Sequence, residues 1–378
     1  MNVVFFAVRN HHVKYFTRLA QDANDNGYFQ AKVLRHKQLW TRGRGFETHP
    51  DLPEIVSLKL KELAQDNDDY KLSDWHNLTQ PVWMAFWSRF LFSAYRQSLV
   101  AEQPDCLITW SGMMWHQRIM ATAARTLGIP VIFMENGPLP LTTTVDAKGV
   151  NFNNSLPRDL SFYQQPDVTE QPLPEHLIPR APHKNKRTVS DNSSSLPISY
   201  LFVPFQVDAD RQVLCFSPWI PNMRVFYSLL EAALDSLPDS MHIVVKEHPS
   251  CPKDFSDLHK KNPRIRFANS HNTQSLIENS VAVVTINSSV GLEAMLLSKP
   301  VIVLGDAFYN IKGLVQSAAN PEQLKQRFQE ARELKPSNES KRYLSYLYHQ
   351  YLIKGSWKEA SEQHVEAMNR RIAELLHQ

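Results

Sequence analysis

The chain has 378 residues, enough for two domains of roughly 150 residues or more, each with its own hydrophobic core. Hydrophobic residues make up 43% of it and charged residues 21%, close to the average of soluble globular proteins. The 41 Lys and Arg against 38 Asp and Glu leave a net charge of only +3, so strong electrostatic capture of nucleic acid is not indicated.

The cellular compartment is indicated by what the sequence lacks. No run approaches eighteen uncharged apolar residues, and the N-terminus has no basic stretch followed by a long apolar one. Three scattered cysteines, Cys106, Cys215 and Cys251, are too few for a disulfide framework or a zinc site. We therefore expect a cytoplasmic protein without a structural metal.

The first half of the chain alternates short apolar runs with helical patterns. A strand is predicted over 3–8 and a helix from about Val13, then a strand over 106–110, a helix over 115–127 and a strand over 131–134. This βαβ rhythm predicts parallel strands.

A second series of the same kind follows, and the pattern after residue 320 is helical. Residues 182–197 between the two series are polar and rich in Ser, Asn and Lys, as in an exposed connector. The amphipathic segment 357–376 is expected to pack back across the first domain. In this series we expect strands near 200–203, 242–246, 281–286 and 301–304, and helices near 221–236 and 290–297. The predicted ranges are an N-terminal domain over 1–182, a linker over 183–197, a C-terminal domain over 198–340 and C-terminal helices over 341–378.

Polar residues follow the predicted strands of the second domain, where ligands bind in open parallel sheets. Ser288 and Ser289 open a helix and can hold a phosphate, although taken alone an N-cap is the more common role of a serine at such a position. Lys246 and His248 end the strand before it, which puts a cation and an imidazole at the same edge of the sheet. Together these residues predict a clamp for a nucleotide phosphate.

Three carboxylates are candidates for covalent or acid–base chemistry. Asp208 and Asp210 are two residues apart after the strand near 200–203, and a solvated or helix-capping turn is the alternative for them. Glu135 ends the strand over 131–134 before a Gly-Pro turn and is a candidate general acid or base. Asp146, in a polar loop, is expected to be structural.

An acceptor site is expected in the first domain. Two of its loops carry cationic, imidazole and aromatic groups suited to holding a sugar. The motifs of Rossmann dehydrogenases, P-loop kinases, serine hydrolases and zincins do not occur. The expected acceptor residues are Arg9, His12, Trp110, Gly112 and His116.

Four strings in the sequence resemble those of the bacterial β-Kdo transferases of capsule polysaccharide and lipopolysaccharide biosynthesis. They are ENGPLP with the downstream TVDAKGVN, VPFQVDADRQ, KEHP and NSSVGLEA, which lie within residues 135–151, 203–212, 246–249 and 287–294. The resemblance implies the GT-B fold, in which two Rossmann-like domains face each other across a cleft and the C-terminal helix crosses back. It also implies a retaining enzyme that transfers Kdo, a 2-keto sugar acid, from CMP-β-Kdo to a saccharide acceptor of lipopolysaccharide O-antigen or capsule.

The resemblance also implies roles for individual residues. Asp210 corresponds to the catalytic nucleophile, with Asp208 as the fallback, and Glu135 would act as base on the acceptor hydroxyl. His248 would stabilise the leaving phosphate, and Glu293 resembles the glutamate that holds ribose hydroxyls. The implied donor-binding set is Lys246, Pro249, Asn287, Ser288, Ser289, Gly291, Glu293, Gln206 and Ser217.

No metal or other cofactor is expected, because the CMP donor has a single phosphate. The acceptor glycan is expected to be lipid-linked, and Arg370 and Arg371 in the last helix suggest peripheral contact with the inner membrane. A CMP-sialic acid transferase, another GT-B nucleotide-sugar enzyme and a non-catalytic glycan-assembly subunit remain as alternatives.

Overall fold

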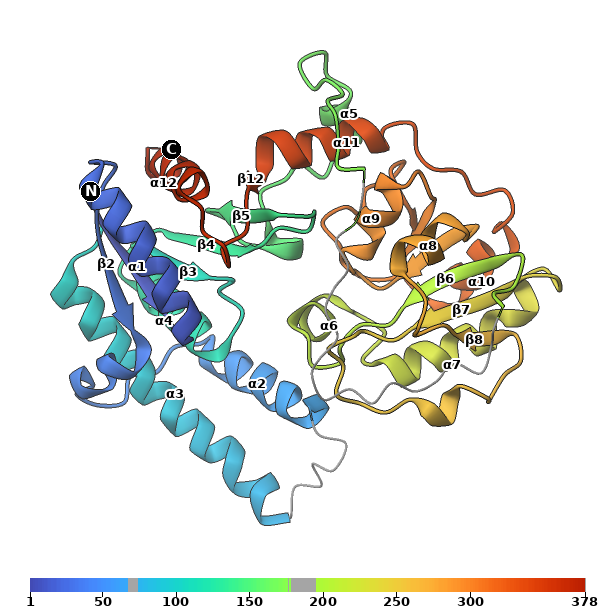
Figure 1. Ribbon diagram of the computed structural model, residues 1–378. Helices are drawn as coiled ribbons and strands as arrows, with labels where there is room; N and C mark the ends of the chain where they lie inside the picture. Colours follow the sequence, from blue (N-terminus) through green and yellow to red (C-terminus); the bar gives the residue numbers. More distant parts are fainter. Residues whose placement is uncertain (67–73, 176, 178–194, 378) are drawn as a thin grey trace. The chain divides into compact units, whose positions relative to one another are not determined.

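The computed structural model describes residues 1–66, 74–175, 177 and 195–377. They form two compact α/β units (Figure 1). Of the described residues, unit 1 contains 1–63, 74–155 and 351–377, and unit 2 contains 64–66, 156–175, 177 and 195–350. Two α/β domains built on mainly parallel sheets confirm the predicted fold class.

Unit 1 is built on a six-stranded sheet in the order β12-β5-β4-β3-β1-β2. β2, β1, β3 and β4 are parallel, whereas β5 is antiparallel to β4 and β12 is antiparallel to β5. The strands are β1 Asn2–Ala7, β2 Gln30–Arg35, β3 Cys106–Trp110, β4 Val131–Asn136, β5 Thr142–Asp146 and β12 Ile353–Lys354.

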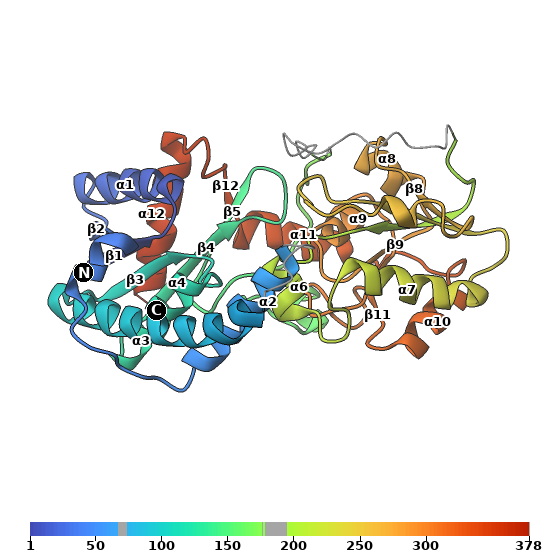
Figure 2. The same ribbon diagram turned by 90° about the horizontal axis from the view of Figure 1, so that it is seen from below.

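Helices cover both faces of this sheet, as Figure 2 shows with α1 and α12 on one side and α3 and α4 on the other. Side chains alternate along β1, so Phe5 packs with α1 whereas Phe6 meets Tyr95 of α3 at 5.2 Å between ring centroids. The helices are α1 Asn10–Asp25, α2 Leu52–Asp66, α3 Asp74–Glu102, α4 Trp115–Thr126 and α12 Glu362–Leu376, with 3₁₀ turns η1 His36–Arg42 and η2 Asn151–Asn153.

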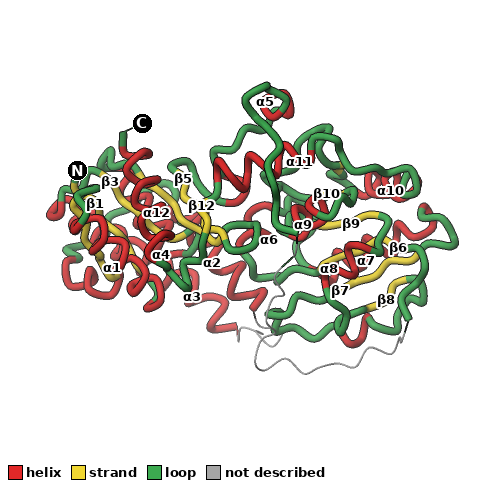
Figure 3. The backbone as a smooth tube through the Cα atoms, turned by 45° about the horizontal axis from the view of Figure 1, so that its top comes forward, coloured by secondary structure: helices red, strands yellow, loops and turns green. Residues whose placement is uncertain are grey.

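Unit 2 has a second six-stranded sheet in the order β11-β10-β9-β6-β7-β8, with every pair parallel (Figure 3, yellow). In chain order this is the 3-2-1-4-5-6 arrangement of a Rossmann fold, whose direction reverses between β6 and β9. The strands are β6 Tyr200–Pro204, β7 His242–Lys246, β8 Ile265–Phe267, β9 Ala282–Thr285, β10 Val301–Val303 and β11 Gln316–Ser317.

The core of unit 2 lies between the sheet and the helices α7 and α10, with Leu201, Val203 and Val245 fully buried in it. On the other face, the Tyr200 hydroxyl donates to the Leu276 carbonyl of α8 at 3.0 Å. The helices are α5 Leu160–Tyr163, α6 Arg211–Phe216, α7 Met223–Ala233, α8 Thr273–Glu278, α9 Val290–Leu296, α10 Pro321–Gln329 and α11 Ser340–Tyr346, with shorter turns η3 Leu234–Ser236, η4 Ser256–Leu258 and η5 Leu347–Tyr351.

The observed units differ from the predicted ranges in three places, and in the first of them residues 64–66 belong to unit 2. Residues 156–175 belong to unit 2 rather than to an N-terminal domain that ends at 182, because Phe162 and Tyr163 of α5 pack on Tyr343 and Tyr346 of α11. The same packing keeps residues 341–350 in unit 2. Most of the predicted linker, 183–197, lies outside the described residues.

The last part of the chain returns to unit 1. Helix α12 packs beside α1, with Met368 and Ile372 buried against Leu19 (Figure 1). The prediction of an uninterrupted helical pattern after residue 320 is wrong at Ile353–Lys354, which pairs with β5 as the short strand β12. No helix among the residues with described positions is long and apolar enough to span a membrane.

The polar loop expected around Asp146 is instead the strand β5 and the turn after it. Asp146 is 2% exposed, and its Oδ1 accepts from the Lys148 and Gly149 backbone N–H groups at 2.7 and 3.1 Å. Its Oδ2 accepts from the Ser155 N–H and hydroxyl at 2.8 and 2.7 Å and from the Tyr351 hydroxyl at 2.7 Å. A buried carboxylate thus ties β5 to the returning C-terminal segment, a structural role.

Replacement of this carboxylate, Asp146→Asn, should lower the free energy of unfolding by about 3 kcal/mol, because the amide nitrogen cannot accept the hydrogen bonds that an oxygen accepts. Urea unfolding followed by tryptophan fluorescence measures the change. Asp25→Asn, at the exposed end of α1, is the matched control and should change stability little. Equal effects of the two substitutions would contradict this role.

Candidate functional site

The donor-side residues of the prediction gather in unit 2 at the carboxyl ends of β6, β7 and β9. The strand order reverses between β6 and β9, and in open α/β sheets the crevice beyond such a switch point is where ligands bind. Gln206 and Asn287 each lie two residues beyond the end of one of these strands.

Gln206 and Asn287 form a buried amide pair. The Gln206 side-chain N–H donates to Asn287 Oδ1 at 2.9 Å, and the Asn287 backbone N–H donates to Gln206 Oε1 at 3.3 Å. Asn287 Nδ2 also donates to the carbonyls of Gln212 and Phe216 in α6, at 2.9 and 3.0 Å. The pair therefore holds the ends of two strands and the helix α6 together, and its polar atoms are engaged with protein.

The two neighbouring aspartates have different surroundings. Asp208 is 2% exposed, forms an ion pair with Lys253 at 3.0 Å and accepts from the Met223 backbone N–H at 2.7 Å. Asp210 is exposed at the start of α6, where its Oδ1 accepts from the Gln212 N–H at 2.7 Å as an N-cap. Burial and the ion pair give Asp208 a structural role, so Asp210 is the carboxylate of the two that a ligand can reach.

The KEHP string ends β7 in a turn fixed by its glutamate. Glu247 is 6% exposed and its Oε1 meets His259 Nε2 at 2.8 Å and the Asn269 side-chain N–H at 3.0 Å. Lys246 donates to the backbone carbonyls of Asn269, at 2.9 Å, and of His271. The Lys246 ammonium is thus partly committed to the protein.

The His248 ring is oriented by its own turn. The Ser250 backbone N–H donates to His248 Nδ1 at 3.1 Å. The neutral ring therefore carries its proton on Nε2, where it is a hydrogen-bond donor suited to a phosphate oxygen.

The string after β9 supports a tight turn into α9. The Ser288 hydroxyl accepts from the Val290 N–H at 3.2 Å, which makes this residue a local cap as well as a phosphate candidate. Gly291 lies against the Tyr309 ring, where an added Cβ would be 2.4 Å from the hydroxyl, and that hydroxyl donates to the Ser288 carbonyl. Ser289 and Glu293 are half-buried in the same turn and helix.

Two remaining donor candidates have local roles. The Ser217 hydroxyl donates to the Ile220 carbonyl at 2.5 Å, and Pro249 lies half-buried in the turn after β7. Neither the hydrogen bond of Ser217 nor the position of Pro249 indicates a ligand-binding role.

In unit 1, Glu135 lies at the end of β4 in a frame of aromatic and amide donors. Its Oε1 accepts from Trp110 Nε1 at 3.2 Å and from the Asn136 backbone and side-chain N–H groups at 2.8 and 3.0 Å. Asn136 in turn accepts from the indole N–H of Trp357, in the returning C-terminal segment. Trp357 was not among the predicted residues, because nothing in the local sequence connects it to Glu135.

His12 belongs to the same cluster as an uncharged aromatic partner. Its ring stacks on Trp110 with 4.6 Å between ring centroids, and the side chain is almost fully buried. Burial, with His11 and Arg9 nearby, lowers the pKa of His12 to about 3. At neutral pH His12 therefore offers stacking and no positive charge.

The other predicted acceptor residues have largely different surroundings, although the Gly112 backbone N–H donates to the Trp110 carbonyl and Arg9 lies near His12. His116 packs on His36, and its Nδ1 meets the Tyr95 hydroxyl at 2.9 Å, while burial lowers its pKa to about 3. Arg9 is exposed at the N-cap position of α1, where its side chain makes no capping hydrogen bond. Gly112 lies at the wall of a pocket in unit 1, with a φ of +68° that favours glycine.

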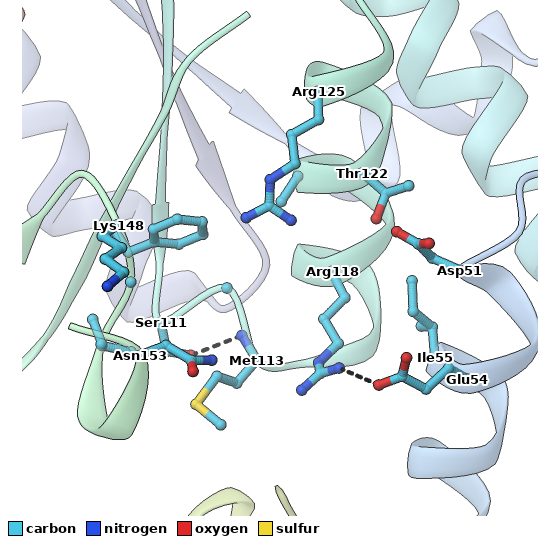
Figure 4. Close-up of a pocket in the computed structure, with 15 residues that line it drawn as sticks. Asp51, Glu54, Ile55, Ser111, Met113, Arg118, Thr122, Arg125, Lys148 and Asn153 are labelled. Atoms are coloured by element: carbon cyan, nitrogen blue, oxygen red, sulfur yellow. Dashed lines mark hydrogen bonds and ion pairs between the residues drawn. The ribbon is translucent and has the colours of Figure 1, made fainter. Parts of the chain in front are cut away.

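That pocket is lined by charged residues that the sequence reasoning passed over, including Arg118, Arg125 and Lys148 (Figure 4). The sequence does contain a pattern that could have identified the two arginines, because residues 118, 121, 122 and 125 have the spacing that puts them on one face of the helix α4. Among the residues open to description, no group of His, Cys, Asp and Glu side chains is arranged to hold a metal ion.

The sequence pattern of the capsule polysaccharide biosynthesis protein family matches residues 105–195 and 180–357. The chain belongs to this family. The predicted membership of a capsule polysaccharide biosynthesis family is thereby confirmed.

Two curated relatives give the range of similarity. Protein FixF of Sinorhizobium fredii is 38% identical over 255 residues, which are 67% of this chain and 61% of that protein. The capsule polysaccharide export protein KpsS of Escherichia coli is 24% identical over 252 residues, 50% of this chain and 64% of KpsS. The matches thus span less than two thirds of either relative.

Among solved structures, Thermosulfurimonas dismutans KpsC, described as a beta Kdo 2,7 transferase, is similar over 99% of both chains. The sequence identity is 15% and the TM-score is 0.48. A second KpsC structure, of a beta Kdo 2,4 transferase, covers 95% of this chain and 97% of its own at 14% identity, also with a TM-score of 0.48.

The amide pair generates a stability prediction. Asn287→Ala should lower the free energy of unfolding by about 3 kcal/mol, because it leaves Gln206 and two carbonyls of α6 buried without their partner. Denaturant unfolding followed by circular dichroism measures this. Asn320→Ala, which removes the N-cap of α10, is the matched control at about 1 kcal/mol. An Asn287→Ala loss no larger than that of the control would contradict the role of the pair.

Proposed function

We propose that this chain is a retaining glycosyltransferase that moves Kdo from CMP-β-Kdo to a saccharide acceptor in the synthesis of a bacterial surface polysaccharide. Membership of the capsule polysaccharide biosynthesis family supports the pathway. The observation that carries the proposal is the grouping of Asp210, His248 and Ser288 around the switch point of unit 2. The choice of Kdo as the sugar rests on the resemblance of the four sequence strings.

In the proposed reaction the Asp210 carboxylate attacks C2 of Kdo while the bond from C2 to the CMP oxygen breaks. The acceptor hydroxyl then gives its proton to Glu135 and displaces Asp210 from C2. Each displacement inverts C2, so the β configuration is retained. The N-cap hydrogen bond from Gln212 orients the Asp210 carboxylate for the first step.

The departing CMP gains negative charge on its phosphate. The His248 Nε2–H, in the tautomer fixed by Ser250, is a donor for this charge, and the Ser288 and Ser289 hydroxyls supply further donors. Glu293 is proposed to hold the ribose hydroxyls. A single phosphate carries less charge than a diphosphate, so these groups suffice without a metal ion.

Calorimetric titration of the full chain in EDTA tests the donor assignment. CMP should bind at least tenfold more tightly than UDP, and His248→Ala should weaken CMP binding about tenfold because it removes one hydrogen bond to a charged group. His349→Ala, whose ring contacts the Pro172 carbonyl, is the matched control and should leave CMP binding unchanged. Tighter binding of UDP, or a metal requirement for CMP, would overturn the assignment.

A further inference from the structure

The pocket beside β3 and β4 of unit 1 has walls of opposite character. Its volume is about 180 Å³, which is room enough for one sugar ring. Ile55, Met113 and Phe133 form its apolar part. Figure 4 shows Arg118 and Arg125 extending into it from α4.

One stripe of α4 builds the cationic wall. Residues 118, 121, 122 and 125 lie at the i, i+3, i+4 and i+7 positions, and all four line the pocket. The two arginines are about 10.5 Å apart along the helix axis at 1.5 Å per residue. Ala121 and Thr122 between them are short, which leaves the hollow between the two guanidinium groups.

The charges of the pocket are only partly balanced. Arg118 pairs with Glu54 at 3.7 Å, and Asp51 lies 3.7 Å from the His49 ring. Within the described parts of the chain, the Arg125 guanidinium and the Lys148 ammonium have no hydrogen bond or ion pair to a side chain. Arg125 lies over the Phe133 ring, 5.8 Å from its centroid. Two exposed cations at the mouth of a pocket are suited to an anionic ligand.

The pocket and the carboxylate proposed as the acceptor base share the strand β4, although Glu135 itself does not line the pocket. Phe133 in its wall precedes Glu135 by two residues on β4, a separation of about 7 Å along a strand. Ser111 and Gly112, which follow β3 directly, form the adjoining wall. The spacing along β4 is the basis for expecting the acceptor sugar to have a hydroxyl near Glu135 and a charged substituent in the pocket.

We propose that this pocket binds an anionic group, a carboxylate or a phosphate, on the terminal sugar of the glycan acceptor, with Arg125 and Lys148 as its main contacts and Arg118 in support. The inference rests on the proposed function, since it names the substrate class of the acceptor side. Asp51 and Glu54 on the opposite wall then accept hydrogen bonds from sugar hydroxyls.

Ligand-observed NMR titration of the full chain tests this with three probes: methyl β-glucuronide, glucose 6-phosphate and the neutral methyl β-glucoside. At least one anionic probe should bind about tenfold more tightly than the neutral one, and comparison of the two anionic probes tells carboxylate from phosphate. Arg125→Gln should reduce the discrimination severalfold, with Lys148 accounting for what remains, and Arg125→Lys should keep more of it.

Arg18→Gln, at an exposed arginine of α1, is the matched control and should keep the full discrimination. Equal binding of all three probes, or discrimination unchanged in Arg125→Gln, would overturn the proposal. CMP titration of the same samples separates the two hypotheses. Discrimination without CMP binding contradicts the proposed function alone, whereas CMP binding without discrimination contradicts the pocket assignment alone.

Discussion

The candidate donor site of unit 2 depends on one buried contact, the amide pair of Gln206 and Asn287. It joins the two strand ends at which the order of the sheet reverses, and it also fixes α6 through two carbonyls. Because Asp210 is the N-cap of α6, the position of the proposed nucleophile follows from that pair. Gln206 and Asn287, which the sequence motifs assign to donor binding, thus act here by positioning Asp210.

In unit 1, hydrogen bonds from neighbouring residues likewise orient the candidate base, Glu135. Glu135 ends a parallel strand, and its orientation comes from Trp110 and Asn136, which Trp357 secures from the far end of the chain. The return of the C-terminal segment to unit 1 is therefore part of the site as well as of the fold. His12, which burial keeps neutral, stacks on Trp110, the residue whose indole N–H binds the Glu135 carboxylate.

Much of this architecture was predictable, since buried parallel strands such as 106–110 and 242–246 are continuous apolar runs that end in polar residues. The Thr-rich strand β5 and the two-residue β12 have no such pattern, because they lie at an antiparallel edge. The strand-end candidates were likewise predictable, whereas their partners were not. Trp357 meets Asn136 across 221 positions, and no spacing rule reports such a contact.

The most direct test of the account is intact-protein mass spectrometry of the full chain incubated with CMP-Kdo, generated in situ and without acceptor. We predict a mass increase of one Kdo unit that is absent in Asp210→Asn and retained in Asp239→Asn, an exposed aspartate of the same unit. A mass increase that persists in Asp210→Asn would contradict the covalent role of Asp210. So would the absence of a mass increase in the unsubstituted protein under conditions in which it binds CMP.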